Sequence, residues 1–153
     1  MEIKFMKAAI LEAEKASKID EVPIGAVIVN DGKIIARAHN QMEKTQIATA
    51  HAEILAINKA CKKLKSWRLD NAEMYITVEP CAMCAGAIAN ARIKKVYFGA
   101  YESKSGCAIS KYPVLSDNGL NHTTEFEGGI EREICANIIK NYFKGKRNLK
   151  SLD

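Results

Sequence analysis

The stretch Tyr75-Ile-Thr-Val-Glu-Pro-Cys-Ala-Met-Cys-Ala-Gly86 decides how the rest of this chain folds. Its first four residues are aromatic or β-branched, Pro80 interrupts them, and two cysteines follow in an alanine-rich segment. This order predicts a buried strand, a sharp stop and a helix whose first turn carries both thiols. Cys81 and Cys84 are three residues apart, so they share one face of that helix and can bind one ion. The helix N-terminus also favours the thiolate forms that bind metal.

A Cys-x-x-Cys pair alone is typical of a redox dithiol, of half a structural zinc site or of two buried cysteines. The upstream segment Thr49-Ala-His-Ala-Glu53 favours a metal, because His51 can supply a third ligand. Two thiolates and one neutral imidazole balance the charge of one Zn²⁺ and leave the fourth tetrahedral position to water, as in catalytic zinc sites. Zinc lowers the pKa of such a water to about 7.

Glu53 is not needed as a ligand in this set. Two residues on a helix are roughly 200° apart, so His51 and Glu53 reach one site only if the helix end points at it. We therefore place His51 in the first turn of a helix whose N-terminus faces the metal. The alternative is a structural zinc with a further thiolate from Cys61, Cys107 or Cys135, which leaves Glu53 without a role.

Length and composition indicate an ordinary globular protein. The chain has 153 residues, 48% hydrophobic and 27% charged, and we expect one domain over residues 1–153. No apolar run approaches the roughly 20 residues that span a bilayer, and the N-terminus lacks the apolar core of a signal peptide. Five cysteines without framework spacing favour a reducing cytoplasm.

The hydrophobic periodicity predicts the elements in order. Helices are expected over 3–18, 51–64, 81–90 and from 130 to at least 143, and strands over 22–29, 34–39, 73–78, 95–99 and 123–127. Asp31-Gly32 suits a type I′ hairpin turn between the first two strands. Residues 101–122 are a long polar connection with room for one short helix. Strand–helix–strand alternation implies parallel pairing, so the fold class is a three-layer α/β/α sandwich on a five-stranded mixed sheet.

Taken together, these motifs resemble the zinc-dependent nucleotide deaminases of the cytidine deaminase superfamily, most closely the bacterial tRNA-specific adenosine deaminases. The resemblance runs from the first helix nearly to the end of the last. It rests on Glu-Val-Pro-Ile-Gly-Ala-Val (21–27), Thr-Ala-His-Ala-Glu (49–53), Trp-Arg-Leu (67–69) and Glu-Pro-Cys-Ala-Met-Cys-Ala-Gly-Ala (79–87).

The resemblance implies a cytidine deaminase-like fold and one Zn²⁺ per chain on His51, Cys81 and Cys84, with Glu53 as the proton carrier. It implies that Asn40 hydrogen-bonds the purine, that the backbone near Ala52 lines the same pocket, and that Glu102 and Asn121 contact flanking nucleotides. It also implies a homodimer, for which we expect Ile88, Ala89 and Ile93 to supply an apolar surface. Departures from the family pattern, such as Glu102 for the usual Asp, lie in RNA-facing loops.

The last fourteen residues concentrate positive charge. They hold Lys140, Lys144, Lys146, Arg147 and Lys150 against Asp153, which is +4 of the formal +5 of the chain. Such a run is often a solvated helix face, but Tyr142 and Phe143 interleave with it, as suits single-stranded RNA.

Two function classes follow. The first is hydrolytic deamination of the wobble adenosine in a tRNA anticodon stem-loop, with deamination of a free guanine, adenine or cytosine base or nucleoside as its rival. The second is a non-catalytic, zinc-stabilised RNA-binding module.

Overall fold

The structure, a computed structural model that describes residues 1–152, is built on a five-stranded mixed sheet in the order β2-β1-β3-β4-β5. Its strands are β1 (Gly25–Asn30), β2 (Lys33–His39), β3 (Glu73–Val78), β4 (Lys95–Ala100) and β5 (Glu125–Glu127). β1 pairs antiparallel with β2 and β3, whereas β3–β4 and β4–β5 are parallel. The predicted mixed sheet is therefore confirmed, as is the type I′ turn, because Asp31 and Gly32 both have positive φ.

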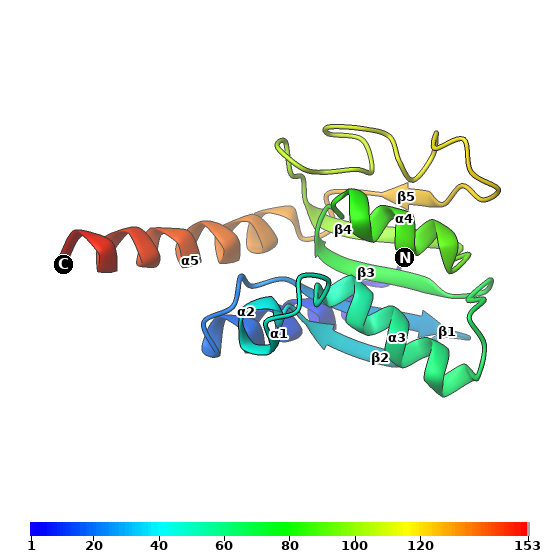
Figure 1. The fold of residues 1–153 in the computed structure, drawn as a ribbon, viewed down its shortest axis with the longest axis horizontal. Helices are drawn as coiled ribbons and strands as arrows, with labels where there is room; N and C mark the ends of the chain where they lie inside the picture. Colours follow the sequence, from blue (N-terminus) through cyan, green and yellow to red (C-terminus); the bar gives the residue numbers. More distant parts are fainter. Residues whose placement is uncertain (153) are drawn as a thin grey trace.

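Helices cover both faces of this sheet (Figure 1). Alternate strand residues enter two separate cores, as the two-residue period of a strand requires. Ile28, Ile76 and Phe98 pack in one core with α3 (Ala52–Leu64) and α4 (Ala82–Asn90). Val27 and Tyr97 pack in the other with α1 (Ile3–Lys18) and the first turns of α5 (Arg132–Leu152). This arrangement confirms the predicted three-layer sandwich.

The first strand begins at Gly25, three residues later than predicted. Pro23 has no N–H to donate to a strand partner, and the N–H of Ile24 donates to the carbonyl of Val22 at 2.8 Å, which closes a tight turn. Gly25 then lies directly under α1, where a Cβ atom would be 2.1 Å from the Ala9 carbonyl oxygen. No larger residue fits there, so the glycine sets the distance between helix and sheet.

Helix ends and connections also differ from the expected bounds. A short helix, α2 (Met42–Thr45), follows Asn40, where the sequence predicts only a loop. His51 and Cys81 are the residues that precede the first turns of α3 and α4 rather than members of them, because both have extended backbone conformations. Between β4 and β5 the chain forms turns and no helix.

Ile88, Ala89 and Ile93 do not form an outer apolar surface, so that prediction is wrong. Each is at most 1% exposed, and the two isoleucines belong to the core between α4 and the sheet. Nearly every position of α4 is apolar, so the sequence gives little sign of which side faces the sheet. The outer side of α4 instead carries small residues and Met83, which is 36% exposed.

The last helix continues past the sheet (Figure 1). Cys135 is buried, and Ile138 and Ile139 pack against the core, but no residue from 140 to 150 is buried. None of the described helices is long and apolar enough to cross a membrane.

Candidate metal centre and catalytic cavity

The N-termini of α3 and α4 bring three potential ligands together. His51 precedes α3, Cys81 precedes α4, and Cys84 lies in the first turn of α4. The His51 Nδ1 atom is 3.7 Å from Cys81 Sγ and 3.5 Å from Cys84 Sγ, and all three ligand atoms lie within 4.8 Å of one another. The set predicted from sequence is thus assembled at one point.

These separations suit one tetrahedral ion. Bonds of about 2.3 Å to sulfur and about 2.0–2.1 Å to nitrogen place neighbouring ligand atoms about 3.5–3.8 Å apart. Among residues 1–152 no fourth His, Cys, Asp or Glu side chain joins the group. Cys61 lies at the far end of α3 beside Trp67, and Cys135 lies in the first turn of α5 with its side chain in the core, so neither completes a closed structural site. Cys107 donates to the Ser105 carbonyl.

Contacts within the set favour a thiolate at Cys81. The Cys84 thiol hydrogen-bonds the Cys81 sulfur, and together with His51 it outweighs the effect of burial and lowers the pKa of Cys81 to about 4. The pKa of Cys84 is raised because it lies against that thiolate and is buried. A soft, negatively charged sulfur next to an imidazole nitrogen is a donor set for a metal ion.

Glu53 stands beside this set in the first turn of α3. It is only 4% exposed, and its Oε1 atom has no hydrogen-bond partner among the described residues. Burial raises the pKa of Glu53 above its usual value of 4.5. A buried carboxyl group with a free oxygen at a cavity wall can accept and release a proton, which is the property a general acid–base group needs.

A cavity of about 210 Å³, the candidate catalytic cavity, opens over these residues. His51, Glu53 and Cys81 line it beside the metal set, and its other walls come from the turn before β1, the end of β3, the segment after β4 and the last helix. Those wall residues are Val22, Ile24, Val78, Glu79, Glu102, Ser105, Ile139 and Phe143.

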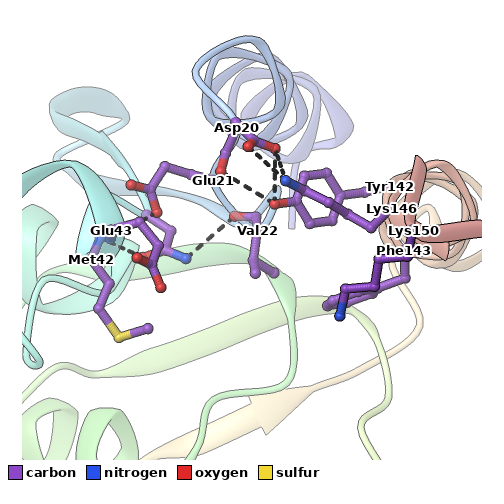
Figure 2. Close-up of a pocket in the computed structure, with 10 residues that line it drawn as sticks. Asp20, Glu21, Val22, Met42, Glu43, Tyr142, Phe143, Lys146 and Lys150 are labelled. Atoms are coloured by element: carbon purple, nitrogen blue, oxygen red, sulfur yellow. Dashed lines mark hydrogen bonds and ion pairs between the residues drawn. The ribbon is translucent and has the colours of Figure 1, made fainter. Parts of the chain in front are cut away.

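A second cavity of about 440 Å³ adjoins the first and shares Val22 and Phe143 with it. Figure 2 shows it between the Asp20–Val22 turn, α2 and the last helix. Lys146 Nζ is 2.6 Å from Asp20 Oδ2, and the Tyr142 hydroxyl donates to the Asp20 carbonyl at 3.2 Å, so Asp20 ties the helix to the body (Figure 2).

The family profile described as MafB19-like deaminase matches residues 2–147. The chain belongs to this deaminase family. A tRNA-specific adenosine deaminase of Bacillus subtilis (strain 168) is 47% identical to it over 146 residues, which cover 95% of this chain and 91% of that protein. The resemblance to the deaminases that the motifs indicate is therefore confirmed.

Solved structures agree with this assignment. A structure from work on A-to-I editing by tRNA:A34 deaminases at the wobble position of transfer RNA matches with a TM-score of 0.87 and 42% identity, over 90% of this chain and 99% of that one. A guanine deaminase from Bacillus subtilis matches with a TM-score of 0.62 and 44% identity, over only 64% of this chain and 63% of that one.

The substrate-binding residues expected for this deaminase are divided between the two cavities. Glu102 lines the catalytic cavity, and Phe143 lines both cavities. Asn40 and Tyr142 line the neighbouring cavity, where the Asn40 amide donates to the Val22 carbonyl and its oxygen accepts the Met42 N–H.

Two expected contacts are not among the residues that line the cavities. The Ala52 side chain is buried in the first turn of α3, but its neighbours His51 and Glu53 both line the first cavity, so a contact from the backbone near Ala52 stays a prediction. Asn121 lies beyond the opposite end of β4, because its neighbour His122 bonds the carbonyl of Ile93, which precedes that strand.

Two buried glutamates of the deaminase, Glu21 and Glu79, were not among the predicted site residues. Glu21 is 1% exposed and accepts the N–H groups of Glu43 and Lys44 at the start of α2, a wall of the second cavity. Glu79 is 3% exposed and lines the catalytic cavity. The sequence does carry a signal for both: Glu21 directly precedes one apolar strand segment, and Glu79 directly follows another. A charged group so close to the core requires a partner.

Proposed function

We propose that this protein hydrolyses the wobble adenosine of a tRNA anticodon to inosine and releases ammonia, with one Zn²⁺ held by His51, Cys81 and Cys84. The observation that carries the proposal is identity of 47% to a tRNA-specific adenosine deaminase over 95% of the chain. Because tRNA is found in the cytoplasm, we place the protein there.

The two adjoining cavities support a polynucleotide over a free base. A free base needs one closed pocket, whereas a nucleotide in a strand needs an open mouth with room for its neighbours. The catalytic cavity continues into the larger second cavity through Val22 and Phe143. Phe143 is 43% exposed and can stack with a base, and the lysines and the arginine of the same helix can meet phosphates. Flipping is least costly from an unpaired loop, which describes an anticodon.

The chain's own residues account for the proton transfers. Bound zinc would supply a Lewis acid that makes water nucleophilic at neutral pH. Glu53 Oε1 accepts a proton as the water attacks the adenine C6 atom and passes it to the ring N1 atom. A second proton then moves through Glu53 to the amino nitrogen, which leaves as ammonia while the C6 oxygen becomes the carbonyl of inosine. The walls of the cavity hold the base against Glu53 and exclude bulk water.

We further propose that the protein is a homodimer. The outer side of α4 supports this, because it is apolar, carries the exposed Met83, and has open space beyond Gly86. Such a surface on a helix next to the cavity suits a two-fold partner.

The test is incubation of purified protein with unmodified tRNA, followed by sequencing of the anticodon. We expect conversion of adenosine at the wobble position and release of one ammonia per conversion. Turnover of free guanine or cytosine, with none on tRNA, would assign the protein to the free-base deaminases. Zinc and RNA binding without turnover of any of these substrates would indicate the non-catalytic module.

A further inference from the structure

Glu79 has no part in the proposed chemistry, although it lies two residues before Cys81 and lines the catalytic cavity. We propose that Glu79 is a positioning residue for substrate recognition: its carboxylate holds the segment from Glu102 to Ser110 in the place where that segment forms a wall of the base pocket. The inference rests on the proposed function for its kinetic test, but its structural basis does not.

Both oxygen atoms of the Glu79 carboxylate accept hydrogen bonds. Its Oε2 atom accepts three consecutive backbone N–H groups, those of Ala108, Ile109 and Ser110, at 3.1, 2.9 and 2.9 Å. Its Oε1 atom accepts the N–H of Glu102 at 3.1 Å and the hydroxyl of Ser110. Charge-assisted bonds of this kind are stronger than those between neutral groups. Both oxygens are thus engaged by one segment of chain and are not free for a metal or a substrate.

The segment wraps tightly around Glu79. The N–H of Gly106 donates to the Glu102 carbonyl at 2.8 Å, and that of Cys107 donates to the Pro80 carbonyl at 2.7 Å. A Cβ atom on Gly106 would lie 2.4 Å from the Glu102 carbonyl oxygen and 2.6 Å from Glu79 Oε1. Any side chain at position 106 must therefore push the segment away from the carboxylate.

The part of the segment that faces the cavity contains Glu102 and Ser105, which both line it. The metal ligands and Glu53 lie at the N-terminal ends of α3 and α4, and none of them forms a hydrogen bond with residues 102–110. Loss of the Glu79 contacts should therefore move a wall of the pocket and leave the reacting groups in place. Such a change weakens the binding of substrate more than it slows the chemical step.

The first measurement needs no RNA. Hydrogen exchange of the peptide that covers residues 102–110 is followed in zinc-loaded wild type, Glu79→Gln and Gly106→Ala. We expect exchange in both variants to be faster by at least about tenfold. In Glu79→Gln the acceptor loses its charge and one of its two oxygens becomes an NH2 group, and in Gly106→Ala the amides are pushed away from the carboxylate. Glu12→Gln is the matched control: Glu12 is also 3% exposed, but its partners are Lys15 and His39, away from the cavity.

The second measurement is kinetic and uses an anticodon stem-loop. We expect Glu79→Gln to raise KM about tenfold with kcat within about threefold of wild type and one zinc per chain. Ser110→Ala, which removes a single bond to the same carboxylate, should have a smaller effect of the same kind. The double variant should resemble Glu79→Gln rather than the sum of the two, because both act through one segment.

Unchanged exchange in residues 102–110 would overturn the proposal, and so would a fall in kcat at constant KM or additive effects in the double variant. If Glu79→Gln does not fold, Gly106→Ala and Ser110→Ala decide the question. If the wild type proves inactive on tRNA, the proposed function fails, but the exchange measurement still decides the role of Glu79 and the kinetics are repeated on the free base that is turned over.

Discussion

Replacement of Glu53 by glutamine should abolish turnover without harming the fold. A general acid–base group typically contributes about 10²–10⁴-fold, which corresponds to about 2.7–5.5 kcal/mol of transition-state stabilisation. The structure places this case at the upper end, because no other described group at the cavity can take over. Glu79 has both oxygens engaged by backbone N–H groups, and Glu102 accepts the Lys104 N–H. We therefore expect a loss in kcat of about 10⁴-fold.

Glu53→Gln should raise the stability of the protein, whereas replacement of a buried carboxylate that is paired usually lowers it. The pKa of Glu53 is raised by burial, so above pH 4.5 its ionised form opposes folding, and the neutral amide removes that cost. Its Oε1 atom has no bond to lose. The assay is single-turnover deamination of an anticodon stem-loop beside thermal unfolding of the zinc-free protein. Wild-type rates, or a Tm several degrees below wild type, would refute this account of Glu53.

Three further outcomes are expected. Bonds from Lys15 and His39 outweigh the burial of Glu12 and hold its pKa below 4.5, so Glu12→Gln should lower the Tm at pH 7 with unchanged kcat. That difference should shrink as the pH falls below 4.5, and a difference that persists would argue against the ion pair as its source. Lys144→Ala and Arg147→Ala should each reduce the log–log salt slope of tRNA binding by about 0.7–0.9 in affinity measurements, and an unchanged slope would exclude a phosphate contact. Met83→Glu should convert a dimer to a folded single chain in sedimentation, and an unaltered dimer would place the interface elsewhere.

The metal set could be predicted from sequence because its geometry is local. Cys81 and Cys84 are fixed by one turn of helix, and His51 needs only a second helix that begins at the same edge of the sheet. The strands follow equally well from their two-residue period, since alternate residues such as Val27 and Ile28 must enter opposite cores.

The walls of the cavity depend on contacts between distant segments, which no local pattern encodes. The bonds between Glu79 and residues 108–110 join positions about thirty residues apart, and the segment on the far side of these bonds forms turns without periodicity. The sequence suggests that Lys146 is a free cation in a basic run, but its Nζ atom donates to the carboxylate of Asp20, 126 positions earlier in the chain. The side of α4 that faces the sheet is hard to predict for a different reason: a helix with small or apolar residues on every side has no polar stripe to mark its outer surface.

The distal half of the last helix, residues 140–150, is under selection for its contacts with substrate rather than for the stability of the fold. Residues 140–150 add no buried side chain to either core. Phe143 lines the catalytic cavity, whereas Lys146 and Lys150 line only the second one. Apart from Phe143, mutations in this half escape the penalty of a disrupted interior, so most of it can drift or be exchanged between related chains while the reaction is preserved. The range of RNAs that such an enzyme accepts can therefore evolve faster than its chemistry, and a graft of this helix is the natural unit for redirecting it.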